Sequence, residues 1–467
     1  MGFTLTFNPG GHVAPTVPLV MFCWIPFVIY LFSKYPAQRA VVMSFLGAWM
    51  FLPEATLALP GIPDYTKMSA TCYGVLLATF IFDVGRFGSF RFGWIDLPML
   101  VWCLCPFVSS MTNGLGAYDG LSAILDQTMT WGIPYFLGRI YLNNLAGIRQ
   151  LAVGIFTGGV IYMPLCLLES RLSPQLHRFV YGDYAFGDFG QSVRLGGYRP
   201  LVFMRHGLTV GAFMMAATLI GIWLWRTGAV KQLWGFQMKW VVGSLLFTFI
   251  LMRSTGAYIQ FALGLLLLFY GKRFRTALPV FVIITLICSY LYANTATSHY
   301  FSDQIIETLS QFLPPERVQS LEFRFTNEEL LTQHARLRMV FGWAGWGRSR
   351  VPLDEYGNIT VQDSLWILAY GVNGLVGLIS MTASMLLPVA SIFWMRYPAK
   401  VWSHPKVAPV AVMAVTVLLY MVDSLVNAHL NPIYVLAIGG VAGLVLKPEK
   451  LKQAVRRPAV PGRAMTA

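Results

Sequence analysis

The sequence predicts an all-α, polytopic membrane protein, and three observations support this fold class. Hydrophobic residues make up 56% of the 467 residues and charged residues only 12%, whereas soluble domains are about a quarter charged. The mean hydropathy is +0.60. Apolar runs of about 20 residues, long enough to cross a bilayer as helices, recur along the whole chain. No soluble block reaches domain size, so we expect residues 1–467 to form a single integral membrane domain.

The apolar runs predict a transmembrane bundle of about 12–13 spans. The run at 121–138 is weak, and it could be re-entrant rather than spanning. No basic residues precede the first run, so we expect an uncleaved anchor there and not a signal peptide. The predicted spans are 12–33, 38–53, 67–85, 95–111, 121–138, 148–168, 201–225, 237–252, 256–271, 277–294, 364–395, 408–426 and 430–446.

Lysine and arginine predict the orientation of the bundle. They gather in alternate loops and in the tail, and such loops normally face the cytoplasm. This accounts for most of the net charge of +14 without nucleic acid. The N-terminus then faces outward, together with outer loops at about 170–200 and 295–363, while residues 447–467 form a flexible basic cytoplasmic tail. The cytoplasmic pairs and triplets are Lys34/Arg39, Arg86/Arg91, Arg139/Arg149, Arg226/Lys231, Lys272/Arg273/Arg275 and Arg396/Lys400/Lys406.

Basic residues also occur on the predicted outer side, where orientation does not explain them. The stretch "QSVRLGGYRPLVFMRHGL" holds Arg194, Arg199, Arg205 and His206, and "LMRSTGA" places Arg253 at the outer end of a span. Guanidinium groups bind phosphate oxygens bidentately and keep their charge. We therefore expect a pocket for a pyrophosphate at the level of the lipid headgroups.

Each of these outer arginines could instead have a structural role. It could form an ion pair with a nearby acid, such as Glu169, Asp183 or Asp188. Arg253 could extend its side chain to the interface, and Arg205 could bind lipid headgroups. Asp126 and Asp423, which lie in or near spans, could be intramembrane partners of arginines.

The long outer segment predicts one or two short helices that lie over the bundle. "SDQIIETLSQFL" has helical spacing and ends at Pro314-Pro315, and "TNEELLTQHARLRMVF" begins at a cap-like Thr326 or Asn327. The second stretch carries His334 and Arg338, which we take as candidate substrate-binding residues. "GWAGWGRSR" follows as a Gly/Trp loop.

Asp363 precedes a long span at the predicted outer face. It is a candidate general base, and "QDSLW" also fits a helix cap. Gly371, Gly374 and Gly377 follow it at a spacing that allows close helix packing. The six cysteines lie in apolar spans and are interpreted as small hydrophobic residues. The sequence has no pair of acids at metal-ligand spacing, so we expect no metal and no cofactor.

These motifs, in this order, resemble the O-antigen ligase and O-antigen polymerase superfamily of bacterial envelope glycosyltransferases. "VRLGGYRP…HGL" resembles the family's outer Arg-x-x-Gly segment, and "MRSTGA" resembles its Ser-Arg-Gly-Ala element. "FGWAGWG" resembles the Gly-x-Gly element of the large outer loop, and "DSLWILAYGVNGLVGL" its last motif. The likeness covers about the last two thirds of the chain. The ligases have a histidine where this chain has Asp363, which favours a polymerase.

The resemblance implies glycosyl transfer at the periplasmic face of the bacterial inner membrane. The donor would be a glycan on a polyprenyl pyrophosphate, and the acceptor another saccharide, without metal or nucleotide sugar. Asp363, Arg253 and Arg194 would be catalytic, and Arg199, Arg205, His206, His334 and Arg338 would bind substrate. A chain-length regulator would be a further partner. The alternatives are a ligase that joins the glycan to lipid A core, and a transporter or flippase of lipid-linked glycan.

Overall fold

The structure is a computed structural model, and it describes residues 4–6, 14–58, 64–185, 189–194, 196–296, 307, 310–311, 315–353 and 359–447. It confirms the all-α prediction, with sixteen α-helices in this part of the chain. Most of the predicted tail at 447–467, and parts of the predicted outer loops, lie outside the described residues.

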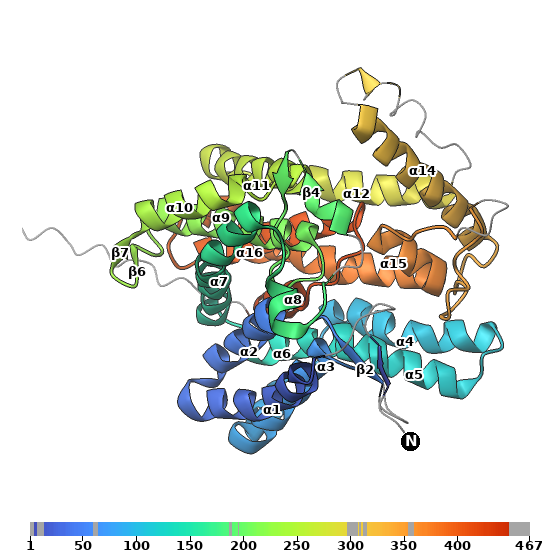
Figure 1. Cartoon of the computed structure of the whole chain (residues 1–467). Coiled ribbons are helices and arrows are strands. Elements are labelled where there is room, and N and C mark those ends of the chain that lie inside the picture. Colours follow the sequence, from blue (N-terminus) through green and yellow to red (C-terminus); the bar gives the residue numbers. More distant parts are fainter. Residues whose placement is uncertain are drawn as a thin grey trace, which may run out of the picture.

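Most of the α-helices pack into one bundle (Figure 1). They are α1 (Thr16–Lys34), α2 (Ala37–Phe51), α3 (Lys67–Phe82), α4 (Leu97–Thr112), α5 (Ala117–Gln127), α6 (Ile133–Tyr141), α7 (Leu145–Leu172), α8 (Leu176–Tyr181), α9 (Gly207–Arg226), α10 (Met238–Ile250), α11 (Thr255–Phe274), α12 (Leu278–Ala296), α14 (Pro315–Arg336), α15 (Leu365–Ser391), α16 (Ala408–Ser424) and α17 (Pro432–Leu446). Each of the predicted spans coincides with one or more of these helices.

The strands are very short. Within the described residues they form one three-stranded and two two-stranded antiparallel sheets: β1 (Thr4–Thr6), β2 (Thr56–Ala58) and β3 (Tyr65–Thr66); β4 (Val193–Arg194) and β5 (Gly197–Tyr198); β6 (Gln232–Leu233) and β7 (Phe236–Gln237). The β6–β7 hairpin and α14 lie at opposite ends of the bundle (Figure 1).

Length and hydropathy identify a multi-pass membrane protein. Six helical segments of the described chain are long and apolar enough to cross a bilayer, and four shorter apolar helices accompany them. The weak predicted span at 121–138 corresponds to α5, a π-helical turn (Thr128–Gly132) and α6 in direct succession. The described cysteines are all unpaired, as the sequence predicted.

The predicted start of the second outer helix is wrong. Thr326 and Asn327 lie inside α14, which begins at Pro315. Their side chains donate hydrogen bonds to the backbone carbonyls of Glu322 and Phe323, one turn earlier. Such bonding to the preceding turn lets polar residues continue a helix that they would otherwise begin.

Helices α16 and α17 form the centre of the bundle, because nearly all of their residues are buried. Gly138 of α6 and Gly439 of α17 bring two backbones into contact. A Cβ at Gly138 would lie 2.1 Å from the carbonyl oxygen of Leu436. Small residues are the usual way for membrane helices to approach this closely.

Helix α15 is broken at Gly374, where φ is 63°. The loop after α14 fills the break: the N–H groups of Trp343 and Ala344 donate to the carbonyls of Gly371 and Val372, at 2.9 Å each. The N–H of Leu375 in turn donates to the loop. The sequence predicted that these glycines allow close packing of helices. In the structure the loop after α14 also packs against this part of α15.

One buried ion pair joins α6 to the start of α4. The Arg139 Nε and Asp96 Oδ1 atoms are 2.6 Å apart, and the two side chains are 6% and 3% exposed. The hydroxyl of Tyr135 also donates to the Asp96 carboxylate. Removal of one member of such a pair leaves a buried, uncompensated charge.

We expect Asp96→Ala to lower the free energy of unfolding by about 3–5 kcal/mol, because it strands the Arg139 guanidinium. The control is Asp83→Ala, which removes the partly exposed Arg86–Asp83 pair and should cost at most about 1 kcal/mol. Thermal unfolding in detergent micelles, followed by fluorescence, measures both. Equal losses in the two variants would show that the buried pair has no special role.

Candidate functional site

A large cavity, of about 1170 Å³, opens between the N-terminal helices, the segments before α9 and before α15, and the α16–α17 loop. Its walls come from five separate parts of the sequence, which are 45–71, 126–130, 184–209, 323–368 and 427–432. Among the described residues, five cationic side chains and three carboxylates line it, which gives a formal charge of +2. The described lining is therefore cationic within a largely apolar protein.

Glu169, near the C-terminal end of α7, holds the segment that carries most of the predicted arginines. Its buried carboxylate accepts the N–H of Leu176 at 2.9 Å, of Leu201 at 2.8 Å and of Val202 at 2.6 Å. Val202 has φ +53, an unfavourable angle for a β-branched residue. The Glu169 carboxylate thus accepts hydrogen bonds from backbone N–H groups. One alternative expected it to form an ion pair with an arginine, and no such pair occurs in the described chain.

Arg194 and Arg205 line the cavity. Neither side chain forms an ion pair within the described chain, and the Nε of Arg194 is buried without a hydrogen-bond partner. Arg205 is exposed and Arg194 is half-buried. Their guanidinium groups therefore leave positive charge at the cavity wall.

His206 faces the cavity from the start of α9. As the N-cap, its Nδ1 accepts the N–H of Leu208 at 3.0 Å, which places the ring proton of the neutral imidazole on Nε2. Burial, and then the charges of His429 and the nearby arginines, lower the pKa of His206 to about 3. The imidazole is therefore neutral at physiological pH.

Asp363 lines the cavity directly before α15. Its Oδ2 lies 3.7 Å from the Nε of Arg324 on α14. Ser364, not Asp363, is the N-cap of α15, so the cap interpretation is wrong. The Asp363 carboxylate is free of a structural role in the helix and remains available to the cavity.

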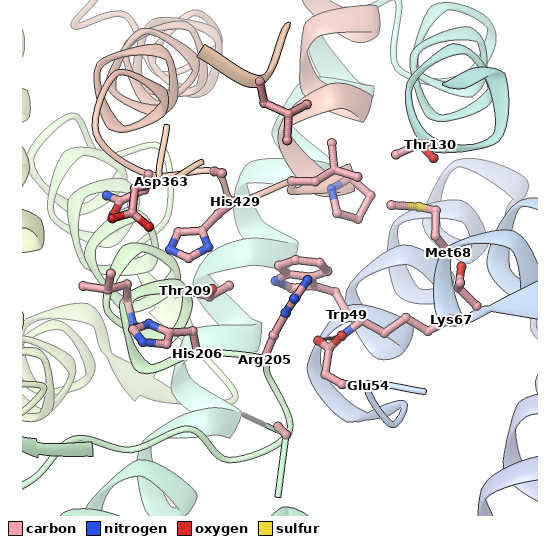
Figure 2. Close-up of a pocket in the computed structure, with 18 of the residues that line it drawn as sticks. Trp49, Glu54, Lys67, Met68, Thr130, Arg205, His206, Thr209, Asp363 and His429 are labelled. Carbon is pink, nitrogen blue, oxygen red and sulfur yellow. Dashed lines mark hydrogen bonds and ion pairs between the residues drawn. The ribbon is translucent and has the colours of Figure 1, made fainter. Parts of the chain in front are cut away.

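His429, in the loop between α16 and α17, is a candidate functional residue that the sequence motifs did not reveal. Its ring stacks on that of His206, with centroids 5.9 Å apart, and its buried Nε2 has no hydrogen-bond partner among the described residues. Figure 2 shows Asp363, His206 and His429 together at one side of the cavity. The polar stretch "VNAHLNP" between two apolar runs was the available signal.

Arg253 and Arg199 do not line the cavity, but they support the residues that do. The Nη1 of Arg253 donates to the carbonyl of Arg194 at 3.2 Å, and its guanidinium packs against Gly197, where a Cβ would lie 1.5 Å away. The Nη2 of Arg199 donates to the carbonyl of Arg253 at 3.2 Å. Both arginines thus brace the β4–β5 hairpin.

His334 and Arg338 lie away from the cavity lining, at the end of α14 and just after it. The His334 ring stacks on Trp343 at 4.2 Å, and its Nε2 is 3.0 Å from the carbonyl of Arg348. The Arg338 guanidinium lies 4.8 Å from the centroid of the same indole. These contacts order the Gly/Trp loop.

The intramembrane acids do not pair with arginines within the described chain. Asp423 of α16 accepts hydrogen bonds from Gln260 at 2.7 Å and Asn427 at 2.8 Å. Asp126 lines the cavity instead. No group of three potential metal ligands occurs in the described ranges.

No protein-family model matches the sequence, and a search of curated proteins found no significant relative. Any function must therefore be inferred from the cavity and from the resemblance of short motifs.

We expect Glu328, one turn after Arg324, to make stability depend on pH. Burial raises its pKa from 4.5 to about 7, so the folded state holds a proton that the unfolded state releases. Stability is then highest below pH 4.5 and falls as the pH rises to about 7. The thermal midpoint of the wild type should decline over this interval.

Glu328→Gln should flatten that decline, because glutamine keeps the hydrogen bond from Tyr290 without the ionisable group. Glu329→Gln, at the adjacent position, is the control. Identical pH dependence in wild type and Glu328→Gln would assign the effect to other groups.

Proposed function

We propose that this protein transfers a glycan from a polyprenyl (undecaprenyl) pyrophosphate to a saccharide acceptor, as a polymerase of surface polysaccharide such as O-antigen or exopolysaccharide. The reaction would take place at the periplasmic face of the bacterial inner membrane. The cavity, the motif resemblance and the positive-inside pattern support this proposal together.

The observation that carries the proposal is the pair of uncompensated arginines. Arg194 and Arg205 face the cavity with no carboxylate partner in the described chain. An anionic ligand would compensate the positive charge of both guanidinium groups. A diphosphate on a lipid carrier supplies that anion at the depth of the headgroups, and guanidinium groups bind it in bidentate geometry.

The chemistry follows from these groups. An acceptor hydroxyl attacks the anomeric carbon of the donor sugar, and the bond from that carbon to the phosphate oxygen breaks. The pyrophosphate leaves with the bonding electrons, and Arg194 and Arg205 stabilise the growing negative charge. Asp363 accepts the hydroxyl proton, while Arg324 holds its carboxylate in place.

His206 and His429 complete this end of the cavity as neutral hydrogen-bonding groups. Burial lowers the pKa of His429 as well. Both imidazoles are therefore neutral, and the arginines supply the positive charge for the diphosphate. The Nε2 of His206 lies 3.3 Å from the Oε1 of Gln191, whereas the Nε2 of His429 is suited to bind a sugar hydroxyl or a phosphate oxygen.

The break in α15 does not favour the transporter alternative. Discontinuous helices in transporters offer free backbone groups to ions and substrates. Here the groups at Gly371, Val372 and Leu375 are hydrogen-bonded to the loop after α14. The break thus fixes an outer loop in place.

Arg205→Ala should reduce turnover by about a hundredfold to a thousandfold, because it removes a cation from the leaving group. The substrate is the lipid-linked glycan that accumulates in source cells lacking this gene, added to full-length protein in proteoliposomes. Gel electrophoresis of the product measures chain growth.

Arg171→Ala, which changes an exposed arginine at the end of α7, is the matched control and should leave turnover intact. Normal polymer length and yield with Arg205→Ala, or no accumulated lipid-linked glycan in the deletion strain, would overturn the proposed function. Product on lipid A core instead of longer lipid-linked chains would identify a ligase.

Asp363→Asn should lower kcat by about 10²–10⁴-fold with little change in KM, because asparagine cannot accept the proton. Asp363→His should restore part of the rate and shift the pH profile toward the pKa of imidazole. Equal activity of the asparagine variant and the wild type would exclude Asp363 as the base.

A further inference from the structure

We infer that Glu328 takes up the proton that Asp363 removes from the acceptor hydroxyl, and that one water molecule in a small second cavity carries the proton between them. This inference rests on the proposed function. It adds the route by which the proton leaves the reacting groups.

The small second cavity shares part of its wall with the large one. Arg324, Val361 and Asp363 line both cavities. Glu328 lines the small cavity and is absent from the lining of the large one. Asp363 therefore borders the space for the substrates and also the space next to Glu328.

The small cavity has the size and the polarity to hold one water molecule. Its volume is about 20 Å³, and a water molecule needs roughly 10–15 Å³ of such space. The polar side chains in its described lining are those of Arg324, Glu328, Asp363 and Ser364, and an interior water normally has about three polar partners. Because carboxylates accept hydrogen bonds, one water molecule can bridge Asp363 and Glu328 through its O–H groups.

The charges around the small cavity favour the binding of one proton. Arg324 supplies the positive charge in the described lining, and Asp363 and Glu328 supply two negative charges when both are ionised. The other described lining side chains are apolar, apart from the hydroxyl group of Ser364. Neighbouring carboxylates that share a single cation repel each other, and a proton on one of them removes this repulsion.

The surroundings of Glu328 suit it to receive that proton. The Tyr290 hydroxyl of α12 lies 3.2 Å and 3.3 Å from its two carboxylate oxygens. The other described charged groups that act on it are Arg324 on the same helix and Asp363 before α15. Burial is the largest influence, and it raises the pKa of Glu328 from 4.5 to about 7. Glu328 is therefore a better proton acceptor than an ordinary glutamate, and it still releases the proton near neutral pH.

The proton transfer balances at each step. As the acceptor oxygen bonds to the anomeric carbon and the pyrophosphate leaves, the hydroxyl proton passes to Asp363. Asp363 then gives a proton to the water molecule, which gives one of its own protons to the Glu328 carboxylate. Asp363 is ionised again, and Glu328 is neutral. Because Glu328 is only partly buried, solvent can take this proton before the next turnover.

The experiment measures kcat for chain growth against pH, with full-length protein in proteoliposomes and the accumulated lipid-linked glycan. In the wild type, kcat should rise as Glu328 ionises around pH 7. Glu328→Gln should abolish this rise and lower kcat by about a hundredfold at about pH 8, the lower end of the effect of a proton-transfer group, with little change in KM. Glu329→Gln, at the adjacent position outside both cavity linings, is the control and should keep the wild-type profile.

Two further variants distinguish the proton route from a structural role of Glu328. Tyr290→Phe removes a hydrogen bond that favours the ionised carboxylate, so the rise in kcat should move to higher pH. The double variant Asp363→Asn/Glu328→Gln should be no slower than Asp363→Asn alone, because both groups act on the same proton.

The proton route is wrong if Glu328→Gln keeps the wild-type rate and pH profile, if the rise in kcat does not move in Tyr290→Phe, or if the two losses multiply in the double variant. Absence of chain growth by the wild type at every pH would instead count against the proposed function.

Discussion

The carboxylate of Glu169 fixes the geometry on which the cationic end of the cavity depends. One acid at the end of α7 accepts three backbone N–H groups from both ends of the segment between α7 and α9. Burial makes each of these bonds costly to lose. They hold Val202 at a positive φ, and only three residues separate it from His206, the N-cap of α9. The position of Arg205 in the cavity follows from this anchor.

The bundle was predictable because hydrophobic runs respond to the bilayer more than to neighbouring residues. Helices α1 to α4 and α15 to α17 begin and end close to the expected positions. The outer segments were harder, since their ends depend on tertiary contacts. Thr326 and Asn327 look like a helix start in isolation, yet their side chains bond to the preceding turn.

The site was predictable only in part, for a related reason. Arg194, Arg205, His206 and Asp363 were expected near a ligand, and the structure places them around one cavity. Arg253 and Arg199 have the same chemistry, but their guanidinium groups are directed to backbone carbonyls. Side-chain direction of this kind cannot be read from spacing. His429 lies in a loop far along the chain from Arg194, Arg205 and His206, so no local motif connects it with them.

The break in α15 has a consequence for how the outer loop can vary among related sequences. Residues 339–344 complete the backbone hydrogen bonding of a helix on which they do not lie, and a Cβ at Gly374 would lie 2.3 Å from the carbonyl oxygen of Val340. An inserted or deleted residue in this stretch would misalign every one of those bonds at once. The stretch should therefore keep a constant length, whereas exposed turns elsewhere can lengthen freely, as surface loops usually do.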